Sequence, residues 1–140
     1  MLPATMDAQQ ALADLTEISS QIQAAVVFDE KGKVAASTLD DDARAGELAR
    51  GALRLLDEAA AVKLGDGAPL TQLEAATPEG SVFVVREDTI RIAATTAPEP
   101  AVGLVFYDLK SALRQIRAEE PPKKKAAAKR ATTKKKGNAA

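Results

Sequence analysis

The sequence contains no cysteine and no histidine, and both absences narrow the chemistry that the chain can perform. Without cysteine there can be no disulfide, and no thiolate can act as nucleophile or metal ligand. Without histidine the chain lacks the side chain that most often serves as a general base near neutral pH and as a metal ligand. We therefore expect a protein that is not an enzyme and that holds no cofactor and no metal.

Long apolar segments are missing as well. No run approaches the roughly 18 apolar residues that a membrane-spanning helix needs. The first ten residues have neither a basic stretch nor an apolar one, so they do not resemble a secretion signal. We therefore expect a cytoplasmic protein without membrane association.

The net charge of −1 combines two segments of opposite sign. Residues 1–120 hold all 20 acidic residues and 11 of the 19 basic ones, whereas residues 121–140 hold eight basic residues and no acidic one. Such a split is typical of an acidic domain that is followed by a basic tail. We place the domain at 7–118. The tail, 119–140, has no Leu, Ile, Val or aromatic residue, so we expect it to be disordered.

The first part of the domain predicts a helix and a hairpin. Apolar residues recur at spacings of three and four over 8–22, which favours a helix, and Asp7 is its expected N-cap. Two short apolar runs follow at 26–28 and 34–37, the first rich in β-forming residues and the second weaker, and together they predict two strands. Gly32 lies between them and supplies the positive φ that a tight turn needs.

The longest helix is predicted over 41–63. The three aspartates at 40–42 are expected to cap its free N–H groups and not to hold a cation, because adjacent carboxylates point in different directions. Charged residues fall on one arc of the helical wheel. Small apolar residues fill about half of the wheel, which is wider than the roughly 100° stripe of an ordinary surface helix. Such a helix can meet two surfaces: its own sheet and a partner.

Three strands and a helix are predicted in the second half. Residues 65–69 break the long helix, and their two glycines are not followed by the residues of a phosphate-binding loop. Segments 70–77, 81–86 and 89–96 read as strands, and their short connections require antiparallel neighbours. Helical spacing returns over 101–118. The order helix, two strands, helix, three strands, helix predicts an α+β domain built on one antiparallel sheet.

The stretches ALADLTEISSQIQAAVVFDEKGKVAAS and IRIAATTAPEPAVGLVFYDLKSALRQI, in this element order, resemble the Roadblock/dynein light chain family, including its bacterial members. The first stretch looks like the family's opening helix and hairpin, and the second like its last strand and closing helix. The resemblance spans about residues 7–117. It implies a five-stranded antiparallel sheet with the long helix on one face and the two terminal helices on the other, in the order α-β-β-α-β-β-β-α.

The resemblance also implies a function. Family members form homodimers or heterodimers through the long helix and the third strand, and serve as adaptors or as regulators of Ras-like GTPases. We therefore expect a homodimeric adaptor or regulatory protein that acts on or beside a small GTPase or another signalling protein. The candidate interface residues form one flank of the long helix and the start of the third strand: Leu48, Ala52, Leu55, Ala59, Val62, Leu70 and Gln72.

The basic tail supports an alternative function. A run of cations can neutralise phosphates without reading sequence, so the chain could bind nucleic acid or polyphosphate. The tail could equally serve only to keep the acidic domain soluble or fold back on it, and both alternatives stay open. The phosphate-binding candidates are Lys123, Lys124, Lys125, Lys129, Arg130, Lys134, Lys135 and Lys136.

Overall fold

The computed structural model describes residues 3–118, apart from 63, 64, 66 and 68. Five strands form one antiparallel sheet in the order β2-β1-β5-β4-β3. The strands are β1 (Ile22–Asp29), β2 (Val34–Ser37), β3 (Gln72–Thr77), β4 (Gly80–Glu87) and β5 (Ile90–Thr96). The helices are α1 (Pro3–Ile18), α2 (Asp42–Ala60) and α3 (Val102–Ala118).

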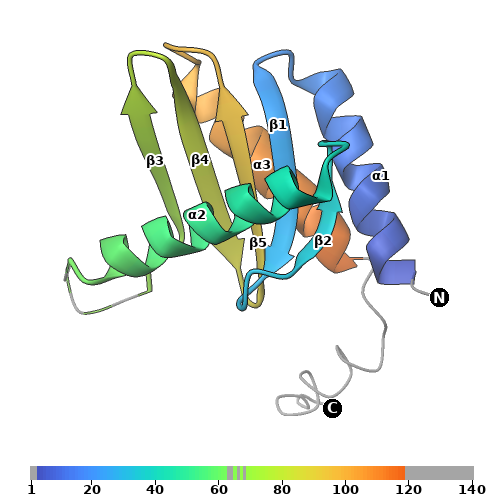
Figure 1. Ribbon diagram of the computed structural model, residues 1–140, viewed down its shortest axis with the longest axis horizontal. Coiled ribbons are helices and arrows are strands. Elements are labelled where there is room, and N and C mark those ends of the chain that lie inside the picture. Colours follow the sequence, from blue (N-terminus) through green and yellow to red (C-terminus); the bar gives the residue numbers. More distant parts are fainter. Residues whose placement is uncertain (1–2, 63–64, 66, 68, 119–140) are drawn as a thin grey trace, which may run out of the picture.

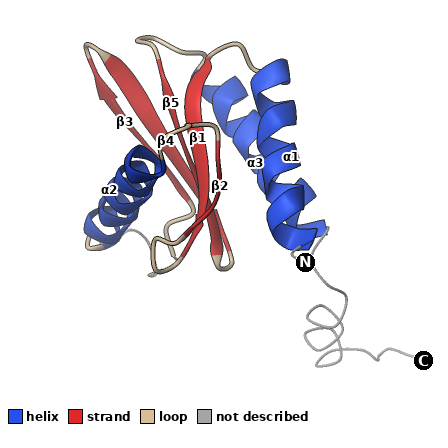
Figure 2. Cartoon of the chain, turned by 45° about the vertical axis from the view of Figure 1, so that its right-hand side comes forward, coloured by secondary structure: helices blue, strands red, loops and turns tan. Residues whose placement is uncertain are grey.

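The molecule has three layers. The helix α2 crosses one face of the sheet, and α1 and α3 lie next to each other on the opposite face (Figures 1 and 2). This arrangement confirms the predicted fold class, including the distribution of the helices over the two faces.

Both faces of the sheet are buried, which explains why its central strands read as nearly continuous apolar runs. Alternate side chains of a strand point to opposite faces. Val27 and Ile92 therefore pack in the cluster beneath α1 and α3. Val26, Phe28 and Val84 pack in the cluster beneath α2.

The hairpin between β1 and β2 depends on Asp29 and Gly32. Gly32 has a φ of 87°, a backbone conformation that residues with a Cβ atom rarely adopt. The Oδ1 atom of Asp29 accepts hydrogen bonds from the backbone N–H groups of Lys31 and Lys33, both at 2.9 Å. Burial alone would raise the pKa of Asp29, but the hydrogen bonds from Lys33 and Lys31 and their positive charges lower it.

The N-terminal helix differs from its predicted limits of 8–22. It ends at Ile18, and Ile22 is the first residue of β1. Both isoleucines fit the helical spacing, yet Ile22 is buried and Ile18 is exposed, because the chain turns between them. The helix also begins earlier, at Pro3, so Asp7 lies inside the helix and is not its N-cap.

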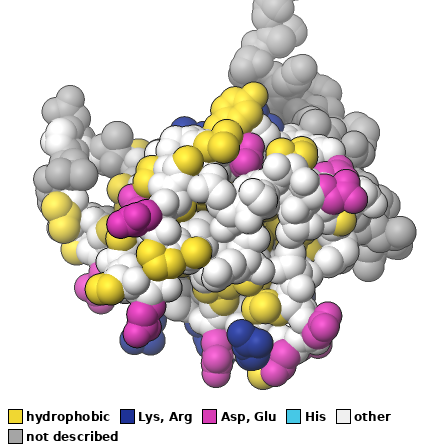
Figure 3. Space-filling model, turned by 90° about the horizontal axis from the view of Figure 1, so that it is seen from above, with side chains coloured by type: hydrophobic (Ala, Val, Ile, Leu, Met, Phe, Trp, Pro, Cys, Tyr) yellow, Lys and Arg dark blue, Asp and Glu magenta, His cyan; other side chains and the backbone are white. Residues whose placement is uncertain are grey.

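The long helix begins as predicted. Asp41 is its N-cap, and the carboxylate of Asp41 accepts a hydrogen bond from the backbone N–H of Ala43 at 2.9 Å. The charged arc faces solvent: acidic and basic side chains alternate along the lower rim of Figure 3, the side that α2 covers. The helix ends at Ala60, three residues before the predicted limit.

Candidate functional site

The buried side of α2 is a ridge of mostly small residues. Ala45, Ala49, Ala52 and Leu56 are buried against the sheet, and their small size lets the helix backbone approach the strands closely. Ala52 was one of the predicted interface residues. It is 1% exposed and packs in the domain's own core, so it has almost no surface to offer to a partner.

The neighbouring flank of α2 is only partly covered by the described part of the domain. Leu55 and Ala59 are half-buried, and Val62, just beyond the helix, is 62% exposed. Leu48 packs against the core and keeps part of its surface accessible. Among the interface residues predicted on this helix, a partner could therefore contact Leu55, Ala59 and Val62.

A glycine interrupts this flank. Gly51 lies three residues after Leu48 and four before Leu55, so all three share one side of the helix. It is exposed, and a Cβ built on it would meet nothing within 4 Å. Glycine inside a helix costs roughly 1 kcal/mol relative to alanine. Since the described part of the domain does not require a glycine there, the position suits close approach by another backbone.

The strand β3 forms one edge of the sheet and pairs with β4. Its Leu73 packs toward α2, whereas Glu74 and Ala76 are exposed. The outer side of an edge strand presents N–H and C=O groups that can pair with another chain. Figure 1 shows the C-terminal end of α2 extending past β3, so the helix flank and the strand edge form one corner of the molecule.

A groove of about 450 Å³ runs between the end of α2 and the start of β3. Ala59, Val62, Leu70 and Gln72 line it, so four of the seven predicted interface residues come together at the end of α2 and the start of β3. Leu70 is half-buried and packs against the cluster beneath α2, and Gln72 is half-buried at the first position of β3. This groove and the adjoining flank of α2 are the candidate site, which we call the α2/β3 corner.

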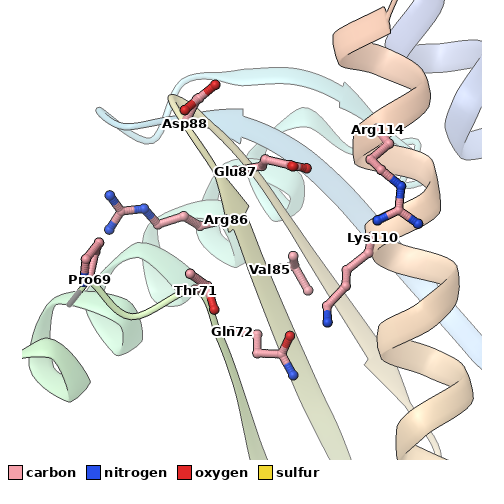
Figure 4. A pocket seen from close by; sticks show the side chains of 9 residues that line it. All are labelled: Pro69, Thr71, Gln72, Val85, Arg86, Glu87, Asp88, Lys110 and Arg114. Carbon is pink, nitrogen blue, oxygen red and sulfur yellow. The ribbon is translucent and has the colours of Figure 1, made fainter. Parts of the chain in front are cut away.

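A second cavity, of about 360 Å³, lies between β4 and α3 (Figure 4). Lys110 and Arg114 extend from α3 toward the strands, and Glu87 extends toward them from β4. Sequence analysis missed this cavity, although the spacing of four between the two cations places them on one face of the helix. Because charges of both signs line it, the cavity does not form a simple anion site.

The motifs weighed for metal and phosphate chemistry have structural roles or lie outside the described residues. In the described ranges, no group of three or more Asp or Glu side chains could hold a metal ion. Gly65 and Gly67 have φ values of 58° and 88°, as expected in a loop that follows a helix. None of the helices that the structure describes is long and apolar enough to cross a membrane. The tail candidates fall beyond residue 118 and outside the described part.

The sequence matches no protein-family model, and a search of curated proteins finds no match. Solved structures do match. A Roadblock/LC7 domain from Streptomyces avermitilis superposes with a TM-score of 0.71 at 18% identity, covering 79% of this chain and 94% of that one. Myxococcus xanthus MglB gives a TM-score of 0.63 at 13% identity, covering 80% of this chain and 86% of that one.

A structure of MglB with a tetrameric arrangement gives a TM-score of 0.63 at 16% identity, covering 83% of this chain and 90% of that one. At these identities the likeness concerns the fold. Together with the sheet order and the placement of the helices, it shows that the described residues form a domain with the Roadblock/LC7 fold.

Proposed function

We propose that this chain is a homodimeric regulatory protein that acts on or beside a small Ras-like GTPase. The proposal is supported by the Roadblock/LC7 fold, by the family resemblance of the sequence, and by the tetrameric arrangement of one structure with the same fold. The α2/β3 corner is the observation that carries the proposal, because it joins an uncovered helix flank to an open strand edge.

A second copy of the chain fits the α2/β3 corner well. Two β3 edges can pair in antiparallel fashion and extend the sheet across the dimer, which satisfies backbone groups that otherwise face water. The two α2 helices then approach each other at Gly51, where the absence of a Cβ allows close contact of the backbones. Val62 and Leu55 supply the apolar surface around this contact. A stable interface of standard size buries about 800 Å² on each partner.

The proposed partner carries the nucleotide. The sequence has no phosphate-loop motif of its own, so the chain is proposed to bind a nucleotide-loaded protein and not the nucleotide itself. The dimer would offer this partner a two-fold surface that one chain lacks. An enzyme activity of the chain alone is not part of the proposal.

Calorimetric titration with purified Ras-like GTPases from the same genome tests this function. We expect one of them to bind the full-length chain in the micromolar range or tighter, with different affinity for its GDP and GTP-analogue forms. A failure of every such GTPase to bind in either nucleotide state, with a chain that is dimeric in solution, would overturn the regulatory function and leave the dimer standing.

A further inference from the structure

Exposed hydrophobic side chains gather on the face of the molecule away from α2. Ile18, at the end of α1, is 73% exposed, and Leu104 and Tyr107, in the first turns of α3, are 54% and 64% exposed. These three are the majority of the five large hydrophobic side chains exposed among the described residues. Hydrophobic side chains also reach the surface in Figure 3 on the side of α1 and α3. Clustering of this kind marks an interaction surface more often than scattered exposure does.

The fold brings the end of α1 and the start of α3 together. Ile22, which follows α1, pairs with Thr96, which precedes α3, so both helix ends lie at the same end of the sheet. The backbone N–H of Ala101 donates to Oε1 of Gln21 at 2.7 Å and fixes the two connections to each other. The two helices therefore run antiparallel and next to each other, as Figure 2 shows.

A groove of about 280 Å³ separates the exposed sides of the two helices. Leu104 stands four residues before Asp108 and thus on the same side of α3. Among the residues that the structure describes, no lysine or arginine lines the groove, and its lining includes the carboxylates of Asp14 and Asp108. The residues that matter for the argument are Asp14 and Ile18 of α1 and Tyr107, Asp108 and Ser111 of α3.

Asp108 is the unusual member of this groove. Its side chain is only 8% exposed, yet within the described part of the chain it has no hydrogen bond and no ion pair. Asp14, in contrast, accepts a hydrogen bond from Nε2 of Gln10 at 3.0 Å. The carboxylate oxygens of Asp108 are not among the fully buried polar atoms without a partner, so they reach the solvent of the groove. The groove therefore presents the negative charge of Asp108 to a cationic group of a partner.

We propose that the groove between α1 and α3 binds an amphipathic helix of another protein, with a lysine or arginine placed to pair with Asp108. Two antiparallel helices present ridges between which a third helix can pack, and its aliphatic residues would cover Ile18, Leu104 and Tyr107. The chain's own residues 119–140 carry cations but no Leu, Ile, Val or aromatic residue, so their sequence offers no large apolar side chain to this rim. The groove lies on the opposite face from α2 and is independent of the dimer.

Tyr107 provides a built-in reporter, because it is the only tyrosine and the chain has no tryptophan. The probe is a synthetic amphipathic helix of leucine, alanine and lysine without aromatic residues, titrated into the full-length chain. We expect binding to change the fluorescence of Tyr107 and to shield it from acrylamide. A control peptide carries glutamate in place of lysine and is expected not to bind.

Matched variants locate the binding site. Asp108→Asn is expected to weaken the lysine peptide by roughly tenfold, the loss of one hydrogen bond to a charged group. Asp57→Asn, which changes an exposed carboxylate on α2, should leave the affinity unchanged. Ile18→Ser, which removes an exposed apolar side chain from the rim, should also weaken binding. Ser111→Arg, which places a cation inside the groove, should also weaken binding, and circular dichroism confirms that each variant is folded.

Three results would overturn the proposal. The first is binding of the glutamate peptide that is as tight as binding of the lysine peptide. The second is an equal loss of affinity in Asp57→Asn and Asp108→Asn, which would show that the peptide responds to the overall negative charge of the domain and not to Asp108. The third is a Tyr107 that is already shielded from acrylamide in the free full-length chain and becomes accessible in Asp108→Asn. That result would show that residues 119–140 occupy the groove themselves.

Discussion

The side-chain amide of Gln9 on α1 forms hydrogen bonds with both the N–H and the C=O group of Ser37 on β2. Nε2 of Gln9 donates to the carbonyl oxygen of Ser37 at 2.9 Å, and Oε1 of Gln9 accepts from the N–H of Ser37 at 3.4 Å. The amide thus binds the outer side of β2 at Ser37, where a further strand would otherwise pair. Since β2 and β3 are the two edges of the sheet and the described residues show no such side-chain contact on β3, the proposed dimer uses the β3 edge.

Replacing Gln9 with alanine tests how much its contact with Ser37 stabilises the β2 edge of the sheet. We expect the free energy of unfolding to fall by about 1 kcal/mol, because two backbone groups of β2 lose their partner. Urea denaturation measures the change. Gln10→Ala is the control, since the side-chain hydrogen bond of Gln10 within the described residues goes to Asp14 of the same helix, a contact worth roughly 0.2–0.5 kcal/mol. Equal losses in the two variants would show that the Gln9 contact does not hold the edge.

The hairpin between β1 and β2 should be sensitive to pH through Asp29. Its pKa is lowered in the folded chain, so the stabilisation by its carboxylate is present above the unfolded value, 3.8, and is lost as the pH falls through the folded value. Asp29→Ala should therefore cost about 1 kcal/mol at pH 7, the value of a typical capping contact. The difference from the parent should shrink below pH 4 in denaturation curves recorded across the range. A constant difference down to pH 2 would contradict this role, and Glu30→Ala, an exposed neighbour, is the control.

Gly51 and Gly103 form a matched pair for the helix flank. Both lie in helices, both are exposed, and a Cβ on either would meet nothing within 4 Å. Alanine at Gly51 should stabilise the fold by up to about 1 kcal/mol through helix propensity, and the gain at Gly103 should be smaller because that residue lies in the first turn of α3. Only Gly51→Ala should weaken self-association, measured by sedimentation equilibrium, because only Gly51 lies on the flank proposed to meet a second α2. Equal association of both variants would remove Gly51 from the interface.

Binding of nucleic acid by residues 121–140 stays a prediction. If all eight cations contacted duplex DNA, the logarithm of the binding constant would fall with the logarithm of salt concentration at a slope of about −7. A shallower slope is expected, because the acidic domain repels the same phosphates. Fluorescence anisotropy with labelled duplexes measures the slope. The control replaces the eight cations with glutamine, and binding that survives in this control would place the site outside the tail.

Much of the fold could be predicted because local signals agreed with the tertiary structure. Turn glycines, prolines and apolar runs defined all five strands, and the limits of β4 differ from prediction by one residue at each end. The end of α1 was wrong because spacing alone cannot separate Ile18, an exposed helix end, from Ile22, a buried strand start. Only the pairing of Ile22 with Thr96, 74 positions later, decides between them.

The candidate sites were less predictable than the fold. The wide apolar arc predicted that α2 has apolar surface beyond the residues that contact the sheet, and the structure shows such surface. A helical wheel does not show, however, which side of that arc meets the sheet. Ala52 was therefore assigned to the partner side although it packs in the core. The α1/α3 groove was missed because its residues come from the two ends of the domain. Tyr107 lies off the apolar stripe of its helix, and spacing along the helix does not show that α1 lies beside it.

The molar mass of the full-length chain in solution tests the central claim most directly. Light scattering coupled to size-exclusion chromatography at about 50 µM should give twice the chain mass, since interfaces of standard size usually support micromolar or tighter binding. Val62→Asp in the α2/β3 corner should give the monomer mass. Leu104→Asp, at an aliphatic position of α3 that is 54% exposed against 62% for Val62, should remain dimeric. A parent chain that elutes as a monomer at this concentration, or a Val62→Asp variant that stays dimeric, would contradict a dimer built on the α2/β3 corner.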